Sequence, residues 1–424
     1  MAGFRLNEFS GTSVKIPDGV TIIETAAFYR CESLISVDIP DSVQVIEDSA
    51  FKDCPRLKSV NIPDSVTEIG SAAFDGCTSL TNVVVGNQVK NIAASAFLEC
   101  SNLVSIVIPK SVTSIGHQAF RGCSKLAHVN IPESVTSIGR MAFYDAGLET
   151  VAVPGSVKSI EYGAFYGTPL ETVYIDYGVT SIGHQAFRGC SKLTHVNIPK
   201  SVTSIGQYAF YGCTSLRSVD IPESVTKISH AAFEGCTNLR SVVIRKGTKT
   251  IAQSAFSDCT NLSAVTIPNS VKNIERFAFH GCTSLKSVVI PDSVTEIGDF
   301  AFFYQCTLYV NDVDEFAQKF EDLLPNVPIK KFDRRENQLQ TYIHRPSAIN
   351  TAQYTENQKH WIGTFMLAAY AASQPRMQHR LPKLPKELVL MILEMIKRAD
   401  AFTSPTKTQS IHMLEDIDTD SGHY

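Results

Sequence analysis

The feature that most constrains this chain is a repeat of 22 or 23 residues that runs through most of its 424 residues. Thirteen units each carry an Ala-Phe pair, with Ile five residues before the Phe and Leu five or six residues after it. Ten of the twelve intervals between successive Phe residues are 23 residues and two are 22. A unit of this length is too short to enclose a hydrophobic core by itself. It must therefore stack on copies of itself. The repeat therefore predicts a solenoid. The repeat Phe residues are Phe28, Phe51, Phe74, Phe97, Phe120, Phe143, Phe165, Phe187, Phe210, Phe233, Phe256, Phe279 and Phe302.

Each unit contains two segments that are typical of short strands. The pattern Leu-x-x-Val-x-Ile alternates apolar and polar residues, is rich in β-branched side chains, and ends at Pro in ten units. The following Ser-Val-Thr-x-Ile-Gly segment predicts a second short extended piece, and x-x-Ala-Phe predicts at most one helical turn. At about 4.8 Å per strand, thirteen units predict a parallel sheet roughly 60 Å long.

The consensus I-P-x-S-V-T-x-I-G-x-x-A-F-x-G-C-T-x-L-x-x-V, repeated over residues 14–310, resembles the BspA-type, or Treponema pallidum-type, leucine-rich repeat. The resemblance implies a curved leucine-rich-repeat solenoid, rich in parallel strands and short turns, that binds other molecules and chiefly proteins. It implies no particular reaction. A small α-helical region is expected after the array.

The composition argues against several classes of protein. The chain has 38 basic and 42 acidic residues, so its net charge of -4 gives no polybasic surface for nucleic acid. Its first residues hold no apolar run of signal-peptide length, and the longest apolar stretch, 361–372, is shorter than the roughly 18 to 20 residues that cross a membrane. We therefore expect a cytoplasmic protein with neither a nucleic-acid partner nor a membrane-inserted segment.

The eleven cysteines follow the repeat. Ten stand three residues after a repeat Phe, and Cys306 stands four after. No C-x-x-C pair is present to suggest a metal site, and parallel neighbouring side chains are spaced more widely than a disulfide prefers. We expect buried free thiols that fill space, which are typical of a reducing compartment, and no metal or cofactor.

A duplicated block accounts for the histidines that could suggest a metal site. Residues 111–126 recur almost unchanged 67 residues later, which pairs His117 and His128 with His184 and His195. The copies lie three rungs apart, about 14 Å at strand spacing, so the four rings cannot share one metal ion. The sequence contains no nucleophile elbow, Walker loop, dinucleotide fingerprint or H-E-x-x-H motif. We expect no enzymatic activity.

Half of the fourteen tyrosines lie within residues 144–211. At the strand position between Val and Ile, Tyr174 is the only large side chain, and Tyr is a common anchor of protein interfaces. One hypothesis is that Tyr174, with Tyr177, His128 and His195, forms the centre of a ligand-binding face.

The alternative interpretation assigns these tyrosines a structural role. Tyr144, Tyr166 and Tyr211 occupy the loop position directly after a repeat Phe, where Tyr29 also stands. On this interpretation they fill the edge opposite the sheet face and bind nothing.

Beyond the array the pattern becomes helical. Phe316, Phe320, Leu323 and Leu324 recur at helical spacing behind Asp residues, which predicts a helix over 314–324 that covers the end of the core. A second amphipathic stretch follows at 355–370. The expected organisation is an N-terminal cap at 1–13, repeats at 14–310, the capping helix and end of the array at 311–332, a linker at 333–354, a helical region at 355–400 and a disordered tail at 401–424.

The segment at 384–400 resembles the first helix of an F-box. Its L-P-x-E-L-x-x-x-I-L pattern implies an adaptor-binding helix, and would make the chain the substrate receptor of a cullin-type ubiquitin ligase. The alternative is that this helix packs within the protein. The residues implied in adaptor binding are Leu384, Pro385, Leu388 and Ile392.

Taken together, these patterns favour a non-catalytic protein–protein interaction module. Two alternatives stay open, the ligase substrate receptor and a cell-surface adhesin of the kind known among secreted relatives of this repeat family.

Overall fold

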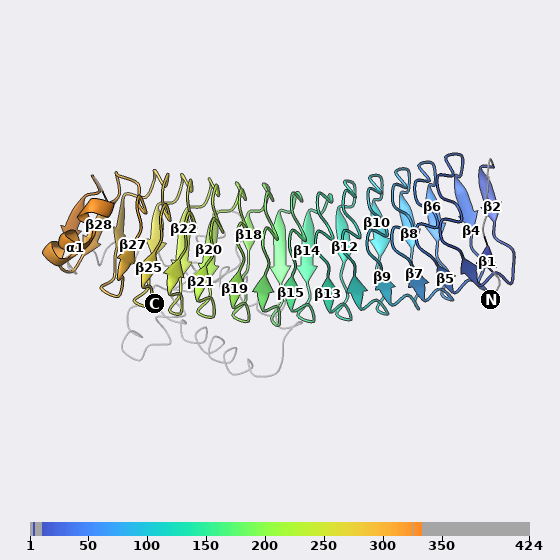
Figure 1. Cartoon of the computed structure of the whole chain (residues 1–424), viewed down its shortest axis with the longest axis horizontal. Helices are drawn as coiled ribbons and strands as arrows, with labels where there is room; N and C mark the ends of the chain where they lie inside the picture. The colour runs from blue at the N-terminus through green and yellow to red at the C-terminus, as the bar shows by residue number, and fades with distance from the viewer. Residues whose placement is uncertain (1–2, 5–10, 325, 333–424) are drawn as a thin grey trace, which may run out of the picture. The chain divides into compact units, whose positions relative to one another are not determined.

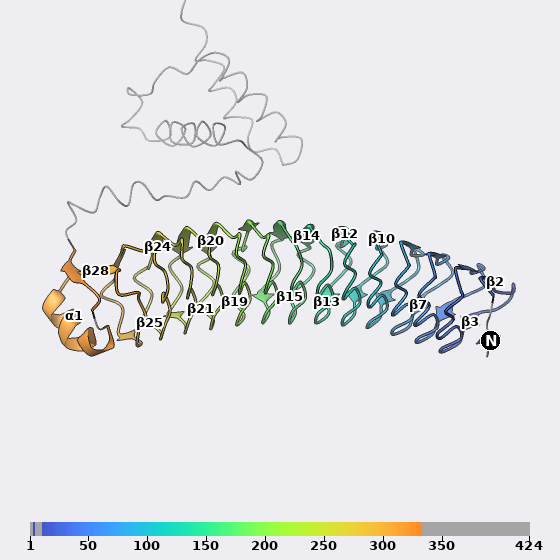
Figure 2. The ribbon, with the colours of Figure 1, turned by 90° about the horizontal axis from the view of Figure 1, so that it is seen from above.

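The computed structural model describes residues 3–4, 11–324 and 326–332 of the chain. Each repeat unit forms one turn of a solenoid and contributes two short strands, one to each of two walls (Figure 1). All strand pairs in these residues are parallel, and seen from above the two rows of strands lie on opposite sides of the solenoid (Figure 2). The predicted repeat solenoid is therefore confirmed.

The first wall is one sheet of 14 strands, and all of them except β1 arise from the Val-Thr-x-Ile segments of the repeats. Its register places Ile46 between Ile23 and Ile69, so the same repeat position lies opposite itself in successive rungs. The strands are β1 (Gly3–Phe4), β3 (Ile22–Ile23), β5 (Val45–Ile46), β7 (Glu68–Ile69), β9 (Asn91–Ile92), β11 (Ser114–Ile115), β13 (Ser137–Ile138), β15 (Ser159–Ile160), β17 (Ser181–Ile182), β19 (Ser204–Ile205), β21 (Lys227–Ile228), β23 (Thr250–Ile251), β25 (Asn273–Ile274) and β27 (Glu296–Ile297).

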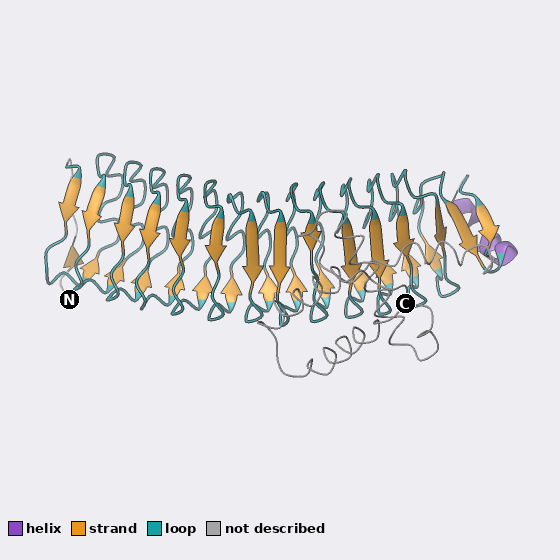
Figure 3. Ribbon diagram, turned by 180° about the vertical axis from the view of Figure 1, so that it is seen from behind, coloured by secondary structure: helices purple, strands orange, loops and turns teal. Residues whose placement is uncertain are grey.

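The second wall arises from the Val-x-Ile segments and contains a nine-stranded sheet followed by two three-stranded sheets (Figure 3). The nine strands are β2 (Ser13–Lys15), β4 (Ser36–Asp38), β6 (Ser59–Asn61), β8 (Asn82–Val84), β10 (Ser105–Val107), β12 (His128–Asn130), β14 (Thr150–Val153), β16 (Thr172–Ile175) and β18 (His195–Val196). The others are β20 (Ser218–Ile221), β22 (Ser241–Ile244) and β24 (Ala264–Thr266), then β26 (Ser287–Val289), β28 (Thr307–Val310) and β29 (Ile329–Lys331).

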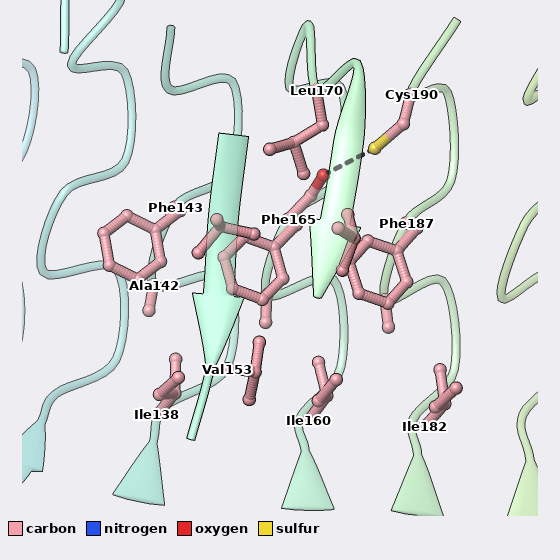
Figure 4. Close-up of a cluster of buried hydrophobic side chains, with 14 of the residues drawn as sticks. Ile138, Ala142, Phe143, Val153, Ile160, Phe165, Leu170, Ile182, Phe187 and Cys190 are labelled. Atoms are coloured by element: carbon pink, nitrogen blue, oxygen red, sulfur yellow. Dashed lines mark hydrogen bonds between the residues drawn. The ribbon is translucent and has the colours of Figure 1, made fainter. Parts of the chain in front are cut away.

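The core is a continuous stack of the repeat Phe rings. All thirteen are buried, and successive ring centroids lie 4.9–5.5 Å apart with nearly parallel planes. Ile five residues before each Phe, and Leu after it, form parallel columns beside the rings, as Figure 4 shows around Phe143, Phe165 and Phe187. Offset aromatic contacts of this kind add to the stabilisation that comes from removing the rings from water.

The Ala-Phe segment forms a tight turn, and not a turn of helix. In every rung the residue two before Phe has a positive φ, such as 56° at Ser49 and 57° at Ser95. A non-glycine residue pays a conformational cost there. Inter-rung hydrogen bonds offset it, since the Phe N–H donates to the Ala carbonyl oxygen of the next rung, at 2.8 Å from Phe51 to Ala73.

One unit departs from the interior pattern at a single position. Thr248 stands where the other units carry Val, and it is fully buried. Its hydroxyl donates a hydrogen bond of 2.8 Å to the Val225 carbonyl oxygen, so the polar group is satisfied inside the core.

The C-terminal end of the core is covered by α1 (Val313–Phe320) and a 3₁₀ turn at Glu321–Leu323. Helix α1 lies where the sequence predicts a helix, one residue earlier, because Asp312 caps it by accepting a 3.0 Å hydrogen bond from the Glu315 N–H. Buried Phe320 and Leu324 pack against the last rung. Strand β29 adds a further parallel partner to β28, which the sequence pattern does not indicate because only Ile329 in it is apolar.

Candidate functional site

The outer face of the nine-stranded sheet carries three of the four residues that the sequence analysis selects. Parallel register aligns His128 with Thr150, Thr150 with Thr172, and Thr172 with His195. Tyr174 lies two residues further along its strand, β16, beside Ala152. These side chains all point away from the core, because strand residues alternate between the two faces. Tyr174 and His195 are therefore diagonal neighbours, about 7–8 Å apart at their Cα atoms.

Tyr174 is 44% exposed on this face, and small or polar residues surround it. Its neighbour in the preceding rung is Ala152, which leaves one side of the ring uncovered by the sheet. His128 lies two strands away on β12, so it is at the margin of any surface that is centred on Tyr174. We call Tyr174, His128 and His195 the sheet-face site.

Tyr177 lies outside this face, in the turn after β16, and is 81% exposed. The turn approaches the preceding rung closely, since a Cβ on Gly155 would lie 2.2 Å from the Tyr177 carbonyl oxygen. Gly178 next to it has a φ of 121°, a conformation that favours glycine. These two glycines fix where Tyr177 emerges, next to but not within the sheet-face site.

The tyrosines that follow the repeat Phe residues form a second group, half-buried, on a different edge of the solenoid. The rings of Tyr144 and Tyr166 stack at 4.5 Å, with 10° between their planes. The guanidinium of Arg121 lies 5.0 Å from the Tyr144 ring centre, and that of Arg188 lies 5.7 Å from Tyr166 and 4.7 Å from Tyr211. We call Arg121, Tyr144, Tyr166, Arg188 and Tyr211 the Tyr–Arg ladder.

Backbone hydrogen bonds hold the Tyr–Arg ladder in register. In each rung of the ladder, the carbonyl oxygen of the residue after the repeat Phe accepts a hydrogen bond from the N–H of the residue two after the preceding Phe. The N–H of Asp145 donates to the Tyr166 carbonyl oxygen, and the N–H of Gly167 donates to that of Arg188, both at 2.8 Å. The side chains of the ladder therefore stack directly above one another. The tyrosines at this edge were visible in the sequence as a cluster, whereas the arginines that share their repeat position were not predicted to join them.

Two further contacts extend the ladder. The Tyr208 ring lies 5.6 Å from the Arg188 guanidinium, and its hydroxyl is 2.8 Å from Nε2 of His230. Arg140 stacks over Tyr162 at 5.1 Å in a neighbouring column. These cation–π contacts restrict the arginine side chains in advance of any binding event.

One phenol and two carboxyl groups near the ladder have raised pKa values. Burial raises the pKa of the Tyr144 phenol and of the Asp145 carboxyl, and Arg121 only partly opposes the effect on Asp145. Burial and nearby Asp258 raise the pKa of Glu234, while His230 and Arg188 lower it. Among the residues that the structure describes, neither carboxylate forms an ion pair.

The cysteines have no reactive character. All eleven are buried free thiols, so the predicted burial is confirmed. Nine of them donate a hydrogen bond of 3.0–3.2 Å to the carbonyl oxygen of the repeat Phe one rung earlier, as Figure 4 shows for Cys190. Burial raises the pKa of Cys54, Cys190 and Cys236 to about 12, so these thiols stay protonated at neutral pH.

Within residues 3–4, 11–324 and 326–332, no three His, Cys, Asp or Glu side chains gather closely enough to hold a metal ion. No helix in the same residues has the length and apolar character that crossing a membrane requires. The predicted adaptor-binding residues Leu384, Pro385, Leu388 and Ile392 lie outside the described part of the chain.

Comparison with known proteins places these features in a family. A family model described as "BspA type Leucine rich repeat region" matches residues 4–127, 90–217 and 203–321. No protein with a curated description matches the chain.

Several solved structures resemble the protein. A leucine-rich repeat protein from Bacteroides ovatus is 25% identical with a TM-score of 0.56, and the match covers 78% of this chain and 94% of that one. A leucine rich cell surface protein from Faecalibacterium prausnitzii is 27% identical, covering 82% and 93%, with a TM-score of 0.39. The T. pallidum leucine-rich repeat protein is 32% identical, covering 49% and 78%, with a TM-score of 0.34. The first of these supports the leucine-rich-repeat fold.

Proposed function

Because the chain belongs to the BspA-type leucine-rich repeat family, we propose that it is a non-catalytic module that binds other proteins through the outer face of its nine-stranded sheet. The observation that supports this most is Tyr174, a large and half-exposed ring whose neighbours on this face, Ala152, Thr172 and His195, are small or polar. Tyrosine is enriched among the few residues that carry most of the energy of a protein interface. The rigid parallel sheet holds the ring in place, so little conformational freedom is lost when a partner binds.

A solenoid suits this role because neighbouring rungs present the same positions side by side. The histidine positions that flank Tyr174 lie in one column, and two threonines separate them. A partner that contacts several rungs would bury hydrogen-bonding side chains at the rim and the Tyr174 ring at the centre. That arrangement, an aromatic centre within a polar rim, is common in protein interfaces.

Affinity capture with the full chain tests the proposal. Captured proteins are quantified by mass spectrometry for the unmodified chain, for Tyr174→Ala and for Val107→Ala. Val107 is the matched control, because it is 74% exposed in the same column of the sheet but three strands away. We expect Tyr174→Ala to lose partners that Val107→Ala retains, with affinity reduced about tenfold or more. Equal capture by all three chains would contradict the proposal.

The ligase-receptor alternative rests on the segment at 384–400, so it is tested separately. A chain that ends at residue 332 keeps every described strand. If a ubiquitin-ligase adaptor is captured by the full chain and not by this truncation, the alternative is supported. Capture of the same proteins by both chains, without an adaptor, would rule it out.

We propose a cytoplasmic location, supported by the eleven unpaired buried thiols, which are typical of proteins in a reducing compartment. Labelling of intact cells with a membrane-impermeant amine reagent tests this. Labelling of the chain would instead support the cell-surface alternative.

A further inference from the structure

The guanidinium groups of the Tyr–Arg ladder form no ion pair within the described residues, although the charge of Arg121 reaches the Asp145 carboxyl and that of Arg188 the Glu234 carboxyl. Within the described residues, the arginine side chains that form ion pairs are Arg30 with Asp53 and Arg245 with Asp220. Among the arginines of the described part of the chain, only Arg245 donates side-chain hydrogen bonds, one of them 2.8 Å long to Asp220. Arg121 and Arg188 are instead held by tyrosine rings, and each guanidinium presents a fork of N–H donors that suits a carboxylate.

The ladder is also restricted to one part of the array. At the position directly after the repeat Phe, five consecutive rungs carry Arg or Tyr, from Arg121 to Tyr211. The rungs on either side of this run carry Leu98 and Glu234 at that position. Both shortened 22-residue units lie inside this run and supply Tyr144 and Tyr166. Elsewhere in the same column Lys52 is already paired with Asp75, at 2.8 Å.

The spacing of the two arginines selects a shape of partner. Three rungs separate Arg121 from Arg188, about 14 Å at the strand spacing. Four residues of an extended polypeptide span about 13 Å and return the side chain to the same face. Acidic side chains four residues apart would therefore reach both guanidinium groups at once.

The stacking disfavours nucleic acid as the occupant. A base would need a free aromatic face, but Tyr144 lies between Arg121 and Tyr166, and Tyr166 lies between Tyr144 and Arg188. What the ladder presents to solvent is the edges of its guanidinium groups and phenols.

We propose that the Tyr–Arg ladder is a second interaction surface, which binds an extended acidic segment of a partner protein through Arg121 and Arg188. The inference rests on the proposed function only in treating the chain as a protein-binding module, since the ladder and the sheet-face site share no residue. The two surfaces would allow one solenoid to bind two segments of a partner.

Fluorescence anisotropy with a dye-labelled decaglutamate peptide tests this, at about 150 mM salt, where long-range attraction is largely screened. Decaglutamine and a ten-nucleotide oligothymidylate serve as comparison probes. We expect the full chain to bind decaglutamate more tightly than either. Arg188→Ala and Arg121→Ala should each weaken the binding roughly fivefold.

The matched control is Arg30→Ala. Arg30 also stacks on a tyrosine, Tyr29, at 5.1 Å, but it is already paired with Asp53 at 3.6 Å. We expect it to leave decaglutamate binding unchanged, and we expect the same of Tyr174→Ala. A Tyr174 variant that loses captured proteins but keeps decaglutamate binding separates the two sites.

Three results would overturn the inference. They are equal binding of decaglutamate and decaglutamine, equal losses in Arg30→Ala and Arg188→Ala, and tighter binding of the oligonucleotide. Circular dichroism of each variant establishes that it is folded, and Arg121→Ala provides an independent test if Arg188→Ala is not.

Discussion

The interior of the solenoid and the edge that carries the Tyr–Arg ladder are built from the same thirteen units, yet they differ in how much each rung varies. Inside, every rung places Phe, Ile and Leu in the same columns, and the one Val replaced by Thr248 keeps its hydroxyl paired. At the edge, the residue after Phe changes from Tyr to Lys, Asp, Leu, Arg and Glu along the array. Burial fixes the interior, because each rung must fit the next, whereas an exposed column is free to acquire binding chemistry.

The largest expected effect on stability comes from a substitution in the buried Phe stack. Phe165→Ala removes one ring from the stack between Phe143 and Phe187, which lie 5.4 Å away on either side. Such truncations cost about 3–5 kcal/mol, so we expect the free energy of unfolding in urea to fall by that amount. Tyr177→Ala is the control, since its ring is 81% exposed and its loss should cost about 0.5 kcal/mol or less. Similar losses in both variants would contradict the distinction between interior and surface.

An intermediate effect comes from the buried thiols at high pH. Burial raises the pKa of Cys236 from its ordinary value of 9.0 to about 12. Between these values the unfolded chain releases the proton while the folded chain keeps it, so stability is fully present below pH 9 and declines as the pH rises towards 12. The decline is about 1.4 kcal/mol per pH unit for each such thiol.

Urea unfolding of the unmodified chain and of Cys236→Ala at pH 7 and pH 10 measures this decline. The variant should lose less stability between the two pH values than the unmodified chain does. An identical pH dependence would show that Cys236 ionises as readily in the folded protein as in the unfolded one.

The smallest expected effect on stability comes from a substitution in the Tyr–Arg ladder. Arg188→Ala removes cation–π contacts at a partly exposed edge, which are worth about 0.5–1 kcal/mol. We therefore expect the free energy of unfolding to change by about 1 kcal/mol or less. A loss as large as that of Phe165→Ala would mean that the ladder holds the fold together and is not chiefly a binding surface.

The fold was largely predictable because burial imposes a period that a single chain displays thirteen times. The columns of Phe, Ile and Leu are visible in the sequence, since every copy repeats them. The capping helix was predictable from its spacing, but β29 was not, because a three-residue strand with one apolar side chain has no periodic signal.

The candidate sites were less predictable. The sequence suggested grouping His128, Tyr174 and His195, and the register of β12, β14, β16 and β18 places them on one face. Their role in binding remains a prediction, as does that of Tyr177, which lies in the adjoining turn.

The sequence alone determined that the repeat units stack, because apolar residues at a fixed spacing are all buried only when successive units lie in register. The tertiary structure alone decided that Arg121, Tyr144, Tyr166 and Arg188 form one ladder. These residues stand 22 or 23 positions apart in the chain. Only the hydrogen-bonded registration of successive turns brings them into contact, and cation–π attraction acts only over a few ångströms.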